Sequence, residues 1–193
     1  MHYWNIVVAL GSYVCIDRVS SIINLKNKLK YMAVIAIDFD GTCVTHDFPE
    51  VGKEIGSEPV LRALVENGHK LILNTMRSHK SEKTTNASDH GMTSTERDVL
   101  QEAVDWFAER NIPLYGINEN PDQHKWTDSP KVFAHVYIDD AALGVPLAVN
   151  SKLSQRAFVD WSAVAKMLHQ IGAITIEQYK YCKEQYQQIH GKS

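Results

Sequence analysis

Two carboxylates and a glycine follow an apolar run at residues 33–42, Ala-Val-Ile-Ala-Ile-Asp-Phe-Asp-Gly-Thr. The apolar residues predict a short strand that is buried on both faces. Asp38 and Asp40 are two positions apart, so their side chains would share one face of an extended chain. Such a pair is tolerated where a divalent cation lies between the groups, or where the two groups differ in protonation. At the carboxyl edge of a parallel strand, the pair predicts an active site.

Other groups that could take part in chemistry also stand at the ends of apolar runs. Leu-Ile-Leu-Asn-Thr at 71–75 ends at Thr75, and Val-Tyr-Ile-Asp-Asp at 136–140 ends at Asp139 and Asp140, with Lys131 shortly before it. Together with Asp-Phe-Asp-Gly-Thr at 38–42, and in this order, these pieces resemble the motifs of the haloacid dehalogenase-like (HAD) phosphohydrolases. The resemblance extends over residues 33–147, which is most of a typical domain.

The resemblance implies a catalytic role for several of these residues. Asp38 would be the nucleophile that forms an aspartyl-phosphate, and Asp40 the general acid–base. Thr75 would offer its hydroxyl and the following backbone N–H to a phosphoryl oxygen. Lys131 would balance the charge between the nucleophile and the phosphate, and Lys125 is the alternative for this role. An Asp at position 40 favours phosphomonoester transfer over ion pumping or carbon–halogen cleavage.

The resemblance also implies a Mg²⁺ site. Its predicted ligands are Asp38, Asp40, Asp139 and Asp140, because hard oxygen ligands suit this ion. Asp139 is the better candidate for direct ligation, and Asp140 would bind directly or through a water. A solvated acidic turn is the alternative for the last pair.

Substrate contacts are predicted around the same two loops, from Gly41, Thr42, Met76 and Arg77. For Arg77, a bidentate contact to the substrate and a surface salt bridge are equally favoured. Three histidines lie in predicted loops and, because they have no metal-ligand spacing, are expected to be solvated: His46, His79 and His90.

Strands and helices are predicted to alternate, which indicates an α/β protein: a Rossmann-like parallel sheet with helices on both faces. The intervals between the motifs leave no room for a large cap domain. The strands after the first are expected at 70–74, 114–117 and 136–138, the polar stretch 78–92 is expected to be a mobile loop, and helices are expected at 59–67, from Thr93 to Arg110, from Asp160 to Gly172 and after Thr175.

Length and composition suit one domain with additions. We predict an N-terminal extension at 1–31 (Met32 is an alternative start), a catalytic core at 32–150 and a C-terminal helical appendage at 151–193. The apolar stripe of the last helix must pack on the domain or on a second copy, so a homo-oligomer is possible. A net charge of −3 argues against stable nucleic-acid binding, three scattered cysteines favour a reducing, cytoplasmic setting, and no stretch is long enough to span a membrane.

The leading hypothesis is a Mg²⁺-dependent phosphomonoester hydrolase with an open site. One alternative is a phospho-acceptor regulatory module, since receiver domains gather similar groups around Mg²⁺. In receivers, however, the acidic pair comes early and the acceptor later, whereas here Asp38 comes first. A second alternative is a polynucleotide-end phosphatase, which uses the same chemistry on a different substrate. The sequence does not identify the substrate.

Overall fold

The computed structural model describes residues 32–79 and 97–191. The predictions for residues 1–31, for most of the loop at 78–92 and for the capping box at Thr93 lie outside these ranges.

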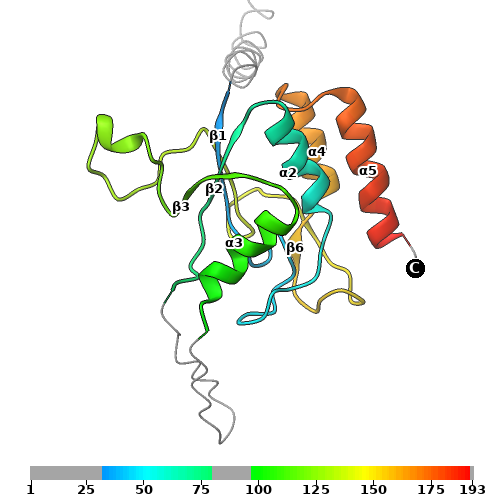
Figure 1. The fold of residues 1–193 in the computed structure, drawn as a ribbon. Helices are drawn as coiled ribbons and strands as arrows, with labels where there is room; N and C mark the ends of the chain where they lie inside the picture. The colour runs from blue at the N-terminus through cyan, green and yellow to red at the C-terminus, as the bar shows by residue number, and fades with distance from the viewer. Residues whose placement is uncertain (1–31, 80–96, 192–193) are drawn as a thin grey trace, which may run out of the picture.

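A four-stranded parallel sheet flanked by helices forms an α/β, Rossmann-like fold (Figure 1). Its strand order is β3-β2-β1-β4, and every neighbouring pair is parallel. The strands are β1 (Val34–Ile37), β2 (Lys70–Leu73), β3 (Leu114–Ile117) and β4 (Val136–Ile138). The predicted strands are therefore confirmed to within one residue. The two central strands are buried on both faces, which explains their continuous apolar sequences.

The helices are α2 (Ser57–Glu66), α3 (Val99–Glu109), α4 (Trp161–Gln170) and α5 (Ile176–His190), with a short 3₁₀ turn η1 (Gln123–Lys125). Helices α2, α4 and α5 lie side by side, while α3 crosses below them in Figure 1. Trp106 and Phe107 of α3 pack their rings on Phe39, just beyond β1. Both residues belong to the hydrophobic core.

Two helices begin elsewhere than the sequence pattern predicted. Helix α2 starts at Ser57, two residues before Pro59, because the Glu54 carboxylate reaches its free N–H groups. One oxygen of Glu54 accepts hydrogen bonds from the backbone N–H of Gly56 and of Ser57, at 2.8 Å each. Helix α3 starts after Asp98, whose side chain accepts from the backbone N–H of the residue three positions on.

Both C-terminal helices begin where the sequence predicted, and α4 also ends there. The Asp160 side chain caps α4, and Gly172, with a φ of 82°, follows its end. Thr175 and Gln178 form the expected capping box at the start of α5. On α5, Cys182 is buried in the core. The stripe of this helix therefore packs on the domain itself, which was one of the two predicted outcomes.

The last part of the chain shares the hydrophobic core of the sheet. Phe158 and Trp161 are fully buried in the same cluster as Ile35 and Ile37 of β1. A short antiparallel pair, β5 (Leu147–Ala148) with β6 (Phe158–Val159), leads into α4. Within the described ranges, no helix has both the length and the apolar character that crossing a bilayer requires.

Candidate active site

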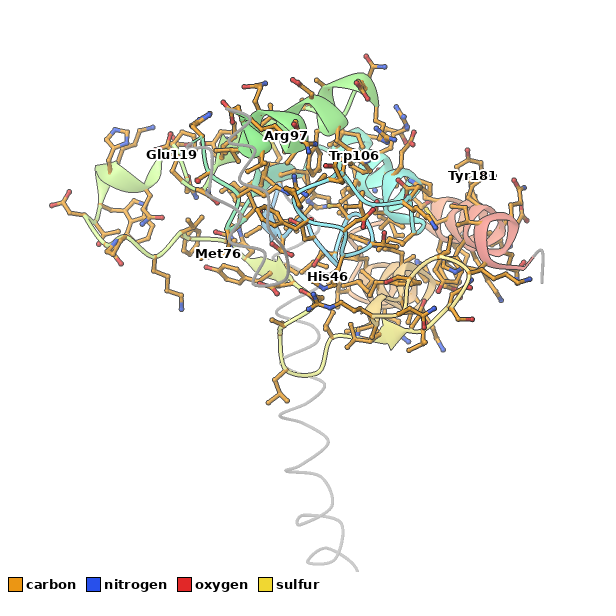
Figure 2. The ribbon with its side chains drawn as sticks, turned by 90° about the horizontal axis from the view of Figure 1, so that it is seen from below. His46, Met76, Arg97, Trp106, Glu119 and Tyr181 are labelled. Carbon is orange, nitrogen blue, oxygen red and sulfur yellow. The ribbon has the colours of Figure 1, made fainter. Side chains whose placement is uncertain are left out.

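The strand register brings the two acidic segments of the chain to one edge of the sheet. Ile37 of β1 pairs with Ile138 of β4, and one residue further the backbone N–H of Asp38 donates to the Ile138 carbonyl at 3.0 Å. Asp38 and Asp139 therefore leave adjacent parallel strands at the same level. Figure 2 views the molecule from the side toward which β1 runs, with His46 and Met76 near the centre of that face.

Three carboxylates meet at this edge. Ligand oxygens of Asp38, Asp139 and Asp140 lie within 4.8 Å of one another, and all three residues are half-buried. We call these residues the acidic cluster. Three hard oxygen donors at such separations could hold a divalent cation. The first and last motifs therefore lie close together, as predicted, which concerns their positions and not their function.

Asp38 is strongly perturbed by its surroundings. Burial is the main cause that raises its pKa, and the negative charges of Asp139 and Asp140 add to the effect. Hydrogen bonds from the Phe39 backbone and the Thr42 side chain lower the pKa, but the net result is a value of about 7. Without a cation, the Asp38 carboxylate therefore titrates near neutral pH, far above its usual range.

Thr42 connects the two acidic segments. Its hydroxyl donates to Asp38 Oδ2 at 3.1 Å and accepts from the backbone N–H of Asp140 at 3.0 Å. Its carbonyl accepts from the indole Nε1–H of Trp161 at 2.6 Å. Thr42 was expected to bind substrate, but its side chain is fully buried. It instead holds the two acidic segments together through its hydrogen bonds.

Gly41, also expected to contact substrate, is buried in a tight turn. Its φ is +80°, its N–H donates to Val44 and its carbonyl accepts from the backbone N–H of Val159 at 2.9 Å. A Cβ at this position would lie 2.1 Å from His46 Nε2 and 2.7 Å from Asp140 Oδ2. Only glycine permits both this conformation and this close approach.

Asp40 lies outside the acidic cluster and is bound by Arg77. The guanidinium donates to both carboxylate oxygens, at 2.8 Å from Nε and 2.7 Å from Nη2. Its remaining donors bind the carbonyls of Pro49, Glu50 and Val99. All of the donors of the guanidinium are therefore used, and its side chain is 1% exposed. Neither role predicted for Arg77 matches this position: it forms a buried pair and leaves no N–H for a substrate.

The second motif lies at the same edge of the sheet, at the end of β2. The backbone N–H of Thr75 donates to the Asn118 side chain at 2.7 Å, and its hydroxyl accepts from the backbone N–H of Arg77 at 3.2 Å. Met76 is 92% exposed. Of the residues expected to bind substrate, Met76 is the one whose side chain is open to solvent.

The two lysines proposed for charge balance, Lys125 and Lys131, have different surroundings. Lys125 is bound to Asp122, which also lies 3.8 Å from Lys70 at the first position of β2. Lys131 is exposed, and its carbonyl accepts from the Gln123 side chain. Across residues 32–79 and 97–191, neither ammonium group forms an ion pair with the acidic cluster, and the assignment of Lys131 stays a prediction.

The sequence did not reveal the place of His46. Its Nε2 lies 2.7 Å from Asp140 Oδ2, and the two side chains are only 17% and 22% exposed. The expectation of a solvated histidine is therefore wrong here. His79, 67% exposed and bound to Asp98, fits that expectation, and His90 lies outside the described residues. No local sequence signal could predict the contact between His46 and Asp140, because 94 positions separate the two residues.

Comparison with known proteins adds a structural relative. No family model and no curated protein matches the chain. The fold is similar to a solved structure described as a conserved protein from Bacteroides thetaiotaomicron, with a TM-score of 0.50 and 27% sequence identity. The similarity covers 72% of this chain and 92% of that one.

Proposed function

We propose that this protein is a Mg²⁺-dependent phosphomonoester hydrolase of the HAD type, which works through an aspartyl-phosphate on Asp38. The observation that carries the proposal is the acidic cluster. Carboxylates from two distant motifs meet at the carboxyl ends of adjacent parallel strands, where ligands bind in open α/β sheets.

The residues of the acidic cluster fit the proposed ion. Burial and mutual repulsion make the cluster unfavourable as three bare carboxylates, as the raised pKa of Asp38 indicates. Asp38, Asp139 and Asp140 would hold Mg²⁺, while both oxygens of Asp40 are already bound by Arg77. The bound ion would offset the carboxylate charge and draw electron density from the phosphoryl group.

In the first step, a carboxylate oxygen of Asp38 attacks phosphorus. An acyl-phosphate bond forms as the phosphorus–oxygen bond to the leaving group breaks. Thr42 fixes the attacking carboxylate through the hydrogen bond to Oδ2. Thr75 and the N–H of Met76 would donate to a phosphoryl oxygen, and Lys131 would approach the phosphate once it is bound.

In the second step, water attacks the same phosphorus and the acyl-phosphate bond breaks. Asp40 would accept a proton from the water, releasing inorganic phosphate and restoring the Asp38 carboxylate. Arg77 donates to both oxygens of Asp40 and so fixes the orientation of this carboxylate. To act as an acid in the first step, Asp40 must carry a proton, so substrates whose leaving group needs none should react most readily.

The test uses p-nitrophenyl phosphate, whose phenolate leaves without protonation. The full chain with MgCl₂ should release nitrophenol over many turnovers, and both Asp38→Asn and excess EDTA should abolish the release. Equal activity of the variant would remove Asp38 from its role, and full activity in EDTA would remove the metal. A single burst with lasting phosphorylation would instead identify a phospho-acceptor module. A panel that includes a 3′-phosphorylated oligonucleotide then tests the polynucleotide-end alternative.

A further inference from the structure

We propose that His46 is a positioning residue of the metal site, which holds the Asp140 carboxylate toward Asp38 and Asp139. The inference rests on the proposed function in one respect, the binding of a divalent ion by the acidic cluster. It assigns a role to a residue that lies outside the four motifs.

The contact between His46 and Asp140 has the geometry of a fixed hydrogen bond. The 2.7 Å separation of Nε2 and Oδ2 lies within the range of charge-assisted bonds, and both side chains are largely shielded from water. Nε2 and Oδ2 form a hydrogen-bonded pair, in which the ring N–H of His46 can donate to the carboxylate of Asp140. This contact fixes one carboxylate oxygen and so limits the rotation of the Asp140 side chain.

Asp140 is held from two sides by the segment that follows β1. Its backbone N–H donates to the Thr42 hydroxyl, and its side chain is bound to His46. Asp139 differs, because its Oδ1 accepts from the backbone N–H of Ala141 in a local turn. The orientation of Asp139 is therefore set within its own loop, whereas that of Asp140 depends on a donor from another part of the chain.

The segment that carries His46 is itself well fixed. The backbone N–H of Thr45 donates to the Lys53 carbonyl at 2.9 Å, and the Lys53 N–H donates to the Thr45 hydroxyl at 2.9 Å. On the other side, the His46 ring lies against Gly41, where no side chain could fit. The imidazole thus meets Asp140 from a rigid turn, as a group that orients a ligand must.

Groups that orient metal ligands have a measurable effect. Their removal weakens metal affinity or activity by roughly 10–100-fold. The loss should appear in the affinity for the ion rather than in the turnover at saturating ion, because no step of the reaction uses the imidazole itself. This split distinguishes a positioning residue from a catalytic one.

The experiment measures Mn²⁺ binding by electron paramagnetic resonance, on the full chain without substrate, for three variants. His46→Met fills the same space without a donor, and we expect it to bind Mn²⁺ about 10–100-fold more weakly. His46→Gln keeps an N–H donor and should retain most of the affinity. His79→Ala removes another His–Asp contact, the one to Asp98 at 2.8 Å, and should leave the affinity unchanged. With p-nitrophenyl phosphate, the Mg²⁺ concentration for half-maximal rate should follow the same order.

Each contrary outcome has a distinct meaning. If His46→Met binds Mn²⁺ as tightly as the unchanged protein, or if His46→Gln loses as much affinity as His46→Met, the positioning role is overturned while the phosphatase proposal stands. An equal loss in His79→Ala would also overturn it. If the unchanged protein binds no Mn²⁺ and Asp139→Asn behaves identically, the metal site of the proposed function fails, and this inference fails with it.

Discussion

The acidic cluster and the Asp40–Arg77 pair lie at the same edge of the sheet but solve the problem of buried charge in opposite ways. In the pair, a guanidinium from the loop after β2 binds both oxygens of Asp40 and is almost completely buried. In the cluster, three carboxylates come together with no lysine or arginine ion pair among the described residues.

The difference between the two sites shows which of them should change with pH and with the concentration of divalent ions. The Asp40–Arg77 pair carries its own cation, so its geometry is complete once the chain has folded. In the acidic cluster, burial and the neighbouring carboxylates raise the pKa of Asp38 to about 7, so its charge changes around neutral pH, and a divalent ion could replace the proton. The predictions below separate the two sites, in order of decreasing expected effect.

The largest effect is expected from Arg77→Met. It leaves the half-buried Asp40 carboxylate without its partner, and breaking a buried pair costs up to about 3–5 kcal/mol in the free energy of unfolding. Thermal and urea denaturation should both show this loss. The double variant Arg77→Met with Asp40→Asn should recover part of it, because no unpaired charge remains. Arg97→Met removes more exposed pairs with Glu50 and Glu102, so its cost should be clearly smaller. Equal losses in the two single variants would contradict the contrast.

Removing a charge from the acidic cluster should raise the free energy of unfolding, whereas Arg77→Met lowers it. In EDTA, Asp139→Asn should be more stable than the unchanged protein, because it removes carboxylate repulsion. With Mg²⁺ at 100 times its dissociation constant, the unchanged protein should gain about 2.7 kcal/mol and the variant much less. Asp47→Asn, at an exposed carboxylate, is the matched control and should respond to Mg²⁺ as the unchanged protein does. A destabilised Asp139→Asn in EDTA would refute this prediction.

The third prediction concerns pH. The pKa of Asp38 rises on folding from 3.8 to about 7, so the folded protein binds more protons than the unfolded chain between these values. The stabilising contribution of the protonated group is therefore complete below pH 3.8 and is lost as the pH rises through about 7. In EDTA, the melting temperature relative to Asp38→Asn should fall between pH 5 and 8, and saturating Mg²⁺ should reduce this fall. If the melting temperatures of the unchanged protein and of Asp38→Asn change with pH in parallel in EDTA, this prediction is wrong.

The smallest effect is expected from Trp161→Phe. This change removes the hydrogen bond to the Thr42 carbonyl and leaves that buried acceptor without the indole N–H, which costs about 1–3 kcal/mol, while an aromatic ring stays in the core. Because Thr42 also binds Asp38 and Asp140, we expect turnover to fall as well as stability. Trp126→Phe, at a position that is 62% exposed, should change neither. Unchanged turnover in Trp161→Phe would show that the acidic cluster holds its geometry without this brace.

The sequence predicted the strands well, because these depend on local patterns. It also predicted that Asp38, Asp139 and Asp140 meet, but Asp40, the fourth predicted metal ligand, is bound to Arg77 instead. A short apolar run that ends in Asp specifies both a buried strand and the edge at which its carboxylate emerges. The capping box at Thr175 is equally local. The burial of Arg77 could not be read in this way, since its partners lie as far as 37 residues away in sequence. The early start of α2 depends on the carboxylate of Glu54, outside the helix, and the position of His46 depends on Asp140 in another motif.

The hydrogen bond between Trp161 and Thr42 has a consequence for biosynthesis. The two residues are 119 positions apart, so the ribosome must add α4 long after it has added β1. Both acidic motifs are already present in a nascent chain that stops before Val159, yet the Gly41–Thr42 turn then lacks two of its hydrogen-bond donors. The Gly41–Thr42 turn of a growing chain should therefore stay incomplete until the segment from Val159 onward emerges and docks.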